Sequence, residues 1–138
     1  MYFLYIIANK ITNKIYIGQT KYPEKRWKQH KHLANKKIKH QHIHRAMNKY
    51  GIDNFTYEII AQSINQEDAD FAEIELIKQY DSRNPEIGYN FSAGGHVSER
   101  SVETRKKLVK NLKEEYLQEK ALSYQKSKRI ICLLLLKN

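Results

Sequence analysis

The chain has 138 residues, which suffices for one compact domain with an appendage and excludes two ordinary domains. Its 25 Lys and Arg outnumber 15 Asp and Glu, and the net charge of +10 favours a polyanion as partner, because phosphate neutralisation dominates nucleic-acid affinity. The single cysteine, Cys132, excludes an internal disulfide and a Cys-based zinc site, and it is typical of a reducing, intracellular setting.

Neither end of the chain has the composition of a membrane segment. The first ten residues are apolar but lack the basic start and the cleavage site of a signal peptide, so they are predicted to form a strand. The run at residues 130–136 has seven apolar residues, far short of the ~20 that a membrane-spanning helix needs. We therefore expect a soluble, intracellular protein, in the cytoplasm, nucleoid or nucleus, with no membrane partner.

Three segments have the composition of strands. Residues 2–7 and 15–19 are rich in β-branched and aromatic side chains, and the polar stretch at residues 9–14 between them is typical of a hairpin turn. A third strand is predicted at residues 55–61, where an apolar side chain stands at every odd position. Together they predict a three-stranded, mainly antiparallel sheet.

Two helices are predicted between the hairpin and the third strand. The first begins at Pro23, a residue favoured in the first helical turn, and runs to about Ala34. The second covers residues 43–50, where apolar side chains recur at helical spacing, and Gly51 is its C-terminal stop.

A third helix and a loop follow the third strand. Asn65 is placed to cap this helix, which is expected to end near Asp81. The residues predicted for its buried side are Ala69, Ala72, Leu76, Ile77 and Tyr80. Turn-forming residues at 84–95 then predict a loop, and the composition changes so abruptly that we expect a domain boundary at about Gly95.

Residues 96–138 are predicted to form a basic, partly amphipathic helical tail. They hold eleven Lys and Arg against five Asp and Glu, and Leu108, Leu112 and Tyr116 stand four residues apart after a possible cap at Ser101. The expected architecture is α+β, with helices flanking the sheet of domain 1–95 and a tail at 96–138 that can extend a DNA-binding surface.

Charge is distributed unevenly within the first domain. Residues 21–50 hold ten Lys and Arg with one acid, whereas residues 52–86 hold nine acids and two bases. A basic wall of this kind is typical of a phosphate-binding surface, although a plain solvated surface is the alternative. His40, His42 and His44 alternate at a period of two, which does not suit a helical zinc site, so contact with phosphate is the favoured interpretation.

Several chemically distinctive residues occur in a particular order. They are Tyr5, Tyr16-Ile17-Gly18, Glu24-Lys25-Arg26-Trp27, His30, a helical Glu73 and Gly88-Tyr89-Asn90, with ten residues between the two tyrosines. This order and spacing resemble the GIY-YIG nuclease family over residues 2–95. The chief departure is the first tripeptide, where Phe3-Leu4-Tyr5 keeps the tyrosine and lacks the glycine.

The resemblance implies a metal-dependent DNA endonuclease. Glu73 is expected to hold one Mg²⁺ (or Mn²⁺), because a helical carboxylate can bind a hard cation that keeps several waters. Glu75 is the alternative ligand, and Glu73 is preferred since Leu76 and Ile77 follow it at the family's spacing. Arg26 suits the charge of a phosphoryl transition state, because its planar fork matches phosphate oxygens.

The remaining catalytic residues are expected to handle protons and geometry. The resemblance implies that Tyr5 is the general base, with Tyr16 and Lys14 as candidate partners that favour its phenolate. His30, one turn beyond Arg26, can relay a proton or orient the phosphate, and otherwise is a surface residue. Asn90 is expected to hydrogen-bond within the site and to fix Glu73 or the phosphate.

DNA is the expected partner, and the sequence points to no protein partner. The residues predicted to contact DNA, or to let its backbone approach, are Lys14, Gly18, Lys25, Lys28, His40 and Arg45. A homing or mobile-element endonuclease is the leading hypothesis. The alternatives are a structure-specific repair or recombination nuclease and a catalytically silent nucleic-acid-binding module.

Overall fold

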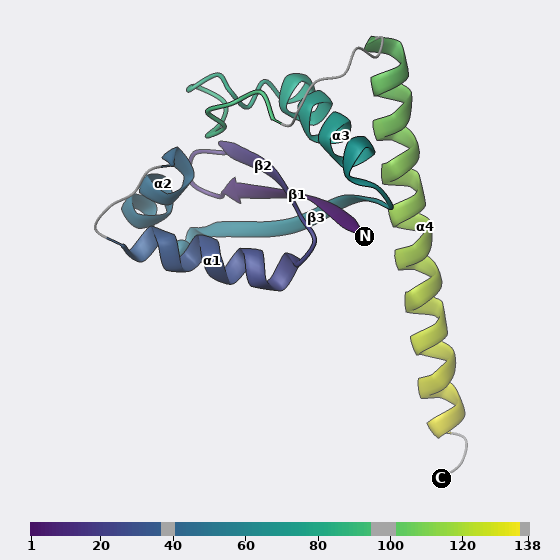
Figure 1. Ribbon diagram of the computed structural model, residues 1–138. Helices are drawn as coiled ribbons and strands as arrows, with labels where there is room; N and C mark the ends of the chain where they lie inside the picture. The colour runs from purple at the N-terminus through teal and green to yellow at the C-terminus, as the bar shows by residue number, and fades with distance from the viewer. Residues whose placement is uncertain (37–40, 95–101, 136–138) are drawn as a thin grey trace.

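The computed structural model describes residues 1–36, 41–94 and 102–135. Its centre is a three-stranded sheet of β1 (Tyr2–Asn9), β2 (Ile15–Thr20) and β3 (Phe55–Ser63), in the order β2-β1-β3. β1 pairs antiparallel with both neighbours, so β2 and β3 are the two edge strands (Figure 1). The predicted α+β class and antiparallel sheet are confirmed.

Helices cover both faces of this sheet (Figure 1). Their bounds are α1 Pro23–Asn35, α2 His42–Tyr50, α3 Gln66–Gln79 and α4 Val102–Leu135, with a short 3₁₀ helix, η1, at Ile52–Asn54. Two helix ends are formed by the residues that the sequence indicated, the start of α3 by Asn65 and the end of α2 by Gly51. Asn65 caps α3 by accepting a hydrogen bond from the backbone N–H of Asp68 at 2.8 Å. Gly51 ends α2 at a φ of 88°, a conformation that suits glycine.

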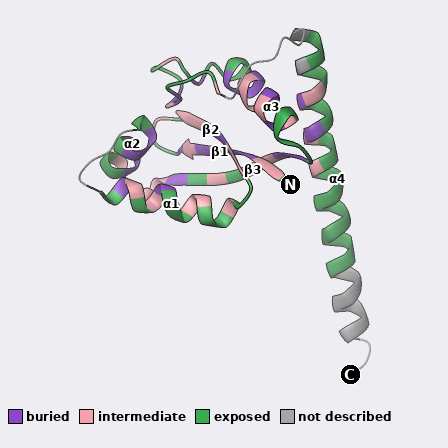
Figure 2. Cartoon of the chain, viewed as in Figure 1, coloured by how far each residue is buried: buried purple, intermediate pink, exposed green. Residues whose placement is uncertain are grey.

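The two faces of the sheet carry separate hydrophobic clusters. Alternate residues of β1 divide between them, because side chains along a strand point to opposite faces. The α1–α2 face buries Tyr5, Ile7, Ala34, Ile43, Ala46, Met47 and Phe55. The α3–α4 face buries Leu4, Ile17, Ala61, Ala69, Ala72, Leu76, Ile77, Val109 and Leu112. Figure 2 shows the buried positions concentrated on the strands and on the helix sides that meet them.

A bulge in β3 changes the predicted alternation of that strand. Leu4 pairs with Ala61 and Tyr5 pairs with Ile59, which leaves Ile60 as an extra residue between them. Ile59 therefore joins the α1–α2 cluster, whereas Ala61 belongs to the α3–α4 cluster. The alternation of apolar odd positions in 55–61 therefore does not place Ala61 on the face of Phe55, Tyr57 and Ile59, because the bulge shifts the register by one residue.

The predicted tail forms one long helix, and its first half is part of the folded domain. Val109 and Leu112 of α4 are 3% and 7% exposed within the α3–α4 cluster, and Gln62 of β3 donates a hydrogen bond to Glu119. The core thus extends beyond the boundary expected at Gly95, which lies outside the described residues together with Ser101. The second half of α4 projects away from the sheet (Figure 1). No described helix is long and apolar enough to cross a membrane.

Candidate active site

The two predicted tyrosines lie on neighbouring strands and on the same face of the sheet. Tyr5 of β1 stands opposite Gly18 of β2, and Tyr16 stands opposite Ile7, so the tyrosines are diagonal neighbours with ring centroids 6.3 Å apart. A Cβ at Gly18 would lie 2.5 Å from the hydroxyl oxygen of Tyr5. Glycine is required here because the ring of Tyr5 occupies the space of a side chain.

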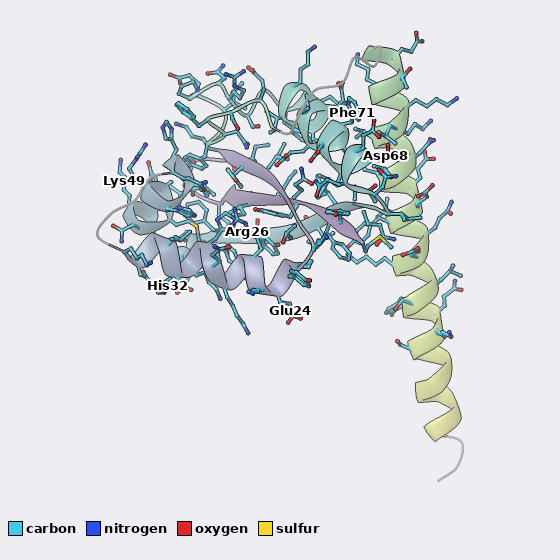
Figure 3. The ribbon with its side chains drawn as sticks, in the orientation of Figure 1. Glu24, Arg26, His32, Lys49, Asp68 and Phe71 are labelled. Carbon is cyan, nitrogen blue, oxygen red and sulfur yellow. The ribbon has the colours of Figure 1, made fainter. Side chains whose placement is uncertain are left out.

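Helix α1 places two further predicted residues against Tyr5. Arg26 donates a hydrogen bond from Nε to the Tyr5 hydroxyl at 3.2 Å, and Nε2 of His30 lies 2.8 Å from the same oxygen. Arg26 and His30 are one turn apart on the side of α1 that faces the sheet. Figure 3 shows Arg26 reaching toward the strands while Glu24 and His32 lie on the outer side of the helix.

Burial determines the ionisation of this cluster. Tyr5 and His30 are 0% exposed, so His30 is not the surface residue that the sequence left open, nor can it contact a phosphate directly in this conformation. Burial, followed by the charge of Arg26, lowers the pKa of His30 to about 3, and the imidazole is neutral at physiological pH. Burial, followed by Tyr16, raises the pKa of Tyr5, and Arg26 opposes this rise.

His44 of α2 extends the cluster by one residue. It is 3% exposed, and its Nε2 lies 2.9 Å from Nδ1 of His30. The sequence placed His44 only within the basic run, as a contact for phosphate. Its position between the buried residues Ile43 and Met47, at helical spacing, was the available signal that it faces the core.

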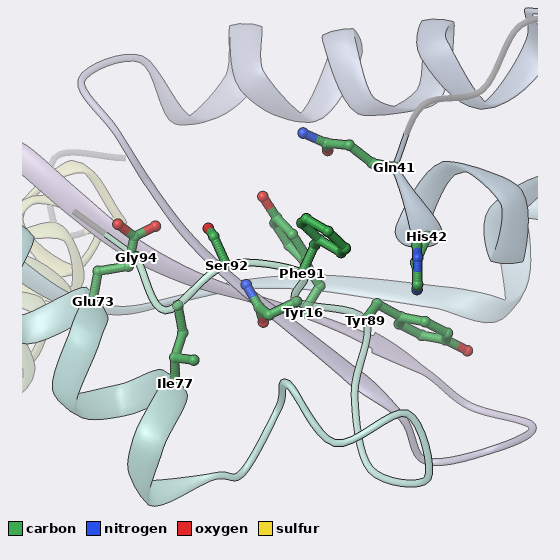
Figure 4. Close-up of a pocket in the computed structure, with 10 residues that line it drawn as sticks. Tyr16, Gln41, His42, Glu73, Ile77, Tyr89, Phe91, Ser92 and Gly94 are labelled. Carbon is green, nitrogen blue, oxygen red and sulfur yellow. The ribbon is translucent and has the colours of Figure 1, made fainter.

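A pocket of about 100 Å³ lies beside Tyr16. Its polar lining includes Glu73 of α3 and Asn90 of the following loop, and Figure 4 shows Tyr16, Glu73 and His42 arriving from three different elements. Apart from His42, the other lining residues were not predicted as site residues: Gln41, Ile77, Tyr89, Phe91, Ser92 and Gly94. Tyr16 thus connects the pocket with the cluster of Tyr5, Arg26 and His30.

Tyr16 also differs from Tyr5 in its surroundings. Burial is the largest influence and raises the pKa of Tyr16, whereas the charge of Arg26 and hydrogen bonding with Arg26 and Tyr5 lower it. Tyr16 is only partly buried and lines the pocket. The tyrosine in contact with the pocket is therefore Tyr16, and Tyr5 lies behind it.

The structure distinguishes the two candidate carboxylates. Glu73 lines the pocket, and its Oε2 accepts a hydrogen bond of 2.9 Å from Gln19 of β2, whose amide also reaches Asp70 at 2.7 Å. Glu75 is 1% exposed and is not among the residues that line this pocket. Two positions along a helix point about 200° apart, so the two side chains leave α3 in different directions.

A divalent cation is compatible with this donor set. The described residues contain no group of three or more His, Cys, Asp or Glu side chains gathered as ligands. A single carboxylate at a partly polar pocket is nevertheless the kind of donor that Mg²⁺ uses, because this ion keeps several waters and takes further oxygens from phosphate. Glu73 fits that requirement.

Asn90 hydrogen-bonds to strand β2 and not to Glu73. Its Oδ1 accepts a hydrogen bond of 2.9 Å from the backbone N–H of Ile17, and its Nδ2 donates one of 2.8 Å to the Ile17 carbonyl. The oxygen and the nitrogen of the Asn90 amide thus both hydrogen-bond to the backbone at the free edge of β2, and not to Glu73. Asn90 attaches the loop after α3 to the strand that carries Tyr16.

The residues predicted to contact DNA are scattered. Lys25 and Lys28 of α1 and Arg45 of α2 are exposed, and His40 lies outside the described residues. Lys14 is half-buried in the hairpin turn, beyond the end of β1, while the hydroxyl of Tyr5 is engaged by Arg26 and His30. Gly18 is buried, so the structure gives it a packing role beneath Tyr5 in place of contact with DNA.

Phe3 is accommodated without disturbing the sheet, although the family pattern has glycine there. It pairs with Thr20 of β2 and with Gln62 of β3 in regular register. The bulge opposite the first tripeptide falls between Leu4 and Tyr5, so it does not involve the position of Phe3.

Comparison with known proteins places this geometry in a family. The sequence model of the GIY-YIG catalytic domain matches residues 1–89. The proposed endonuclease segB of Enterobacteria phage T4 is 33% identical over 96 residues, which cover 68% of this chain and 39% of the phage protein. The chain therefore spans about two fifths of the length of that relative.

Solved structures agree with the sequence match. The catalytic domain of the intron endonuclease I-TevI, in a mutant form, superposes with a TM-score of 0.61 at 29% identity over 70% of this chain and 100% of that domain. A second structure of that domain, described as a homing endonuclease, gives a TM-score of 0.58 at 29% identity over 67% and 99% of the two chains. Since the family model covers more than half of the sequence, the chain belongs to the GIY-YIG family.

Proposed function

We propose that the chain is a metal-dependent endonuclease of the homing or mobile-element type that hydrolyses phosphodiester bonds in DNA. The observation that carries this proposal is that Tyr16 and Glu73 share one pocket, while Tyr5, whose ring lies 6.3 Å from that of Tyr16, is hydrogen-bonded by Arg26. The relatives named as endonucleases, one of them a homing endonuclease, support the choice of reaction and type. The net charge of +10 supports a polyanionic substrate.

Arg26 would stabilise the charge that develops on the phosphoryl oxygens. Its Nε is already directed by the Tyr5 hydroxyl, and one terminal nitrogen donates to Gln29 at 2.7 Å on the exposed side. Exchange of the Gln29 contact for a phosphate oxygen requires only a side-chain movement at the surface. A guanidinium held in this way stabilises the transition state more than a mobile one does, because it needs little reorganisation during the reaction.

Glu73 would hold the cation. When bound, Mg²⁺ or Mn²⁺ supplies charge for the phosphoryl group and for the leaving oxygen. Gln19 fixes one oxygen of the Glu73 carboxylate against β2, so the side chain is oriented before DNA arrives.

The tyrosine pair would form the base. Tyr16 is the member at the pocket, where a water in line with the phosphate would meet it, and Tyr5 stands behind it in contact with Arg26. Burial raises the pKa of both tyrosines, and Arg26 partly opposes this rise, so its charge is the feature of the site that favours their phenolates. Both tyrosines would therefore belong to the general base, and Tyr16 would be the one nearest to the water.

A cleavage assay with matched glutamate variants tests this function. The full chain is incubated with supercoiled plasmid and Mg²⁺ or Mn²⁺, beside Glu73→Gln and Glu67→Gln, the latter an exposed position on the same helix. We expect cutting that EDTA abolishes, a loss of roughly 100-fold or more in Glu73→Gln, and wild-type rates in Glu67→Gln. DNA binding, measured separately by anisotropy, should persist in both variants.

Two outcomes would contradict the proposal. If the wild type cuts no supercoiled, linear, branched or single-stranded DNA with either cation, the chain is a silent binding module. If it cuts branched DNA in strong preference to any linear duplex, the repair or recombination type replaces the homing type.

A further inference from the structure

A buried chain of hydrogen bonds connects the catalytic tyrosine with helix α2. It runs from Arg26 to the Tyr5 hydroxyl, from that hydroxyl to Nε2 of His30, and from Nδ1 of His30 to Nε2 of His44, at 3.2, 2.8 and 2.9 Å. Tyr5, His30 and His44 are at most 3% exposed. A buried polar group needs a partner, and here each ring nitrogen of His30 has one.

The donors and acceptors in this chain can be assigned from its fixed end. The guanidinium of Arg26 only donates, so the Tyr5 oxygen accepts from it, and the proton of Tyr5 needs an acceptor of its own. Nε2 of His30, at 2.8 Å, is placed to be that acceptor. His30 is neutral and carries one ring proton, which must then reside on Nδ1 and be donated to Nε2 of His44.

We propose that His44 is a positioning residue of the catalytic site, whose Nε2 fixes the Nδ1–H tautomer of His30 and thereby turns the Tyr5 proton away from Arg26. This inference rests on the proposed nuclease function only for its effect on rate. The direction of the hydrogen bonds from Arg26 to His44 is itself a property of the folded protein. It leaves the lone pairs of the Tyr5 oxygen available to Arg26, which donates to that oxygen at 3.2 Å.

Packing alone does not account for a histidine at position 44. The neighbouring core positions of α2, Ile43 and Met47, are apolar, and an aliphatic side chain at 44 would fill the same region without a polar cost. An aliphatic residue would also leave the Nδ1–H of His30 buried without an acceptor. His30 would then favour the other tautomer, and two donors would point at the Tyr5 oxygen.

The first test reads the tautomer directly and needs no catalysis. Long-range ¹H–¹⁵N spectra of the full-length protein report which ring nitrogen of each histidine carries the proton, with His30 assigned by comparison with His30→Gln. We expect the proton of His30 on Nδ1 and an unprotonated Nε2 on His44. A proton on Nε2 of His30 in the wild type would overturn the proposal, whether or not the protein cuts DNA.

Three variants then separate positioning from packing. His44→Gln keeps an acceptor oxygen near the position of Nε2, His44→Leu removes it, and His32→Gln alters an exposed histidine on α1 as control. We expect His44→Leu to shift His30 to the Nε2–H tautomer and to lower single-turnover cleavage at saturating DNA by about tenfold or more. His44→Gln should retain the Nδ1–H tautomer and most of the rate.

Unchanged DNA affinity is expected in both His44 variants, because the side chain of His44 is buried. If His44→Leu leaves both the tautomer of His30 and the cleavage rate as in the wild type, His44 is only a packing residue. If His44→Leu does not fold, as judged by circular dichroism, the wild-type spectrum and the tautomer in His44→Gln decide the question.

Discussion

His30 illustrates how one side chain acquires its properties from burial. Its spacing from Arg26 indicated the side of α1 on which it lies, and its Nε2 contacts the Tyr5 hydroxyl at 2.8 Å, while its role in proton transfer stays a prediction. Its exposure of 0% and its contact with His44 could not be read from the sequence, because they depend on how closely α2 packs against α1. The same packing excludes direct contact between His30 and a phosphate in this conformation.

The low pKa of His30 predicts a loss of stability in acid. The pKa is about 3 in the folded state and about 6.5 in an unfolded chain, so between these values the unfolded state binds more protons. The free energy of unfolding should therefore fall as the pH drops below about 6.5, by up to roughly 1.4 kcal/mol per pH unit from this residue. Urea unfolding at pH 7, 5.5 and 4.5 measures the slope.

Asp and Glu side chains in general also titrate in this pH range, so the contribution of His30 is measured by comparing variants. His30→Gln should show a shallower fall in stability between pH 6.5 and 4.5 than the wild type, while His32→Gln should show the wild-type slope. Equal slopes in all three proteins would mean that His30 is not held neutral by the fold.

At the level of secondary-structure elements, the loop after α3 extends the sheet beside β2. Asn90 forms two hydrogen bonds with the edge of β2, and the adjoining backbone of Gly88 bridges Ile15 in parallel. The loop therefore continues the sheet beyond β2 and closes one side of the pocket. The sequence identified Asn90 as important through the family resemblance, but its partner depended on which strand was left at the edge.

Replacement of Asn90 should affect stability as well as activity. Asn90→Ala leaves the N–H and the C=O of Ile17 without these partners at a buried position, which is expected to cost about 1–3 kcal/mol in the free energy of unfolding. Denaturant unfolding measures this, with Asn48→Ala at an exposed position of α2 as control. A change below about 0.5 kcal/mol in Asn90→Ala would show that water replaces the amide at little cost.

Across the whole molecule, the pocket and the basic helix lie toward opposite edges of the sheet. The pocket adjoins Tyr16 on β2, whereas α4 packs against α3 and β3, the other edge strand. The exposed lysines Lys106, Lys107 and Lys110 stand on the part of α4 that is anchored in the core by Val109 and Leu112. We propose that DNA held by both surfaces would extend across the domain.

This arrangement predicts that α4 contributes to affinity and not to chemistry. Replacement of Lys106, Lys107 and Lys110 together by Ala should weaken DNA binding and reduce its salt dependence, by up to about 0.9 in log–log slope for each phosphate that the helix no longer neutralises. Single-turnover cleavage at saturating DNA should be unchanged. Anisotropy titrations at several salt concentrations measure the slope, with Lys78→Ala on α3 as control.

Wild-type affinity and slope in the triple variant would contradict a role of this helical surface in DNA binding. A fall in the saturated cleavage rate with normal affinity would instead indicate that α4 acts on the catalytic residues through the core.

The order of elements and the ends of α2 and α3 could be predicted from the sequence, because they depend on local preferences, and the candidate reacting groups were identified through the family resemblance. Gly51 and Asn65 determine helix ends within one turn of the chain. The spacing of Tyr5, Tyr16 and Arg26 is set by their positions in the sequence. Three other features became known only from the folded chain: which tyrosine meets the pocket, the support that His44 gives to its neighbouring histidine, and the change of register in β3. Each of these depends on contacts between segments distant in sequence, where packing and burial set the outcome.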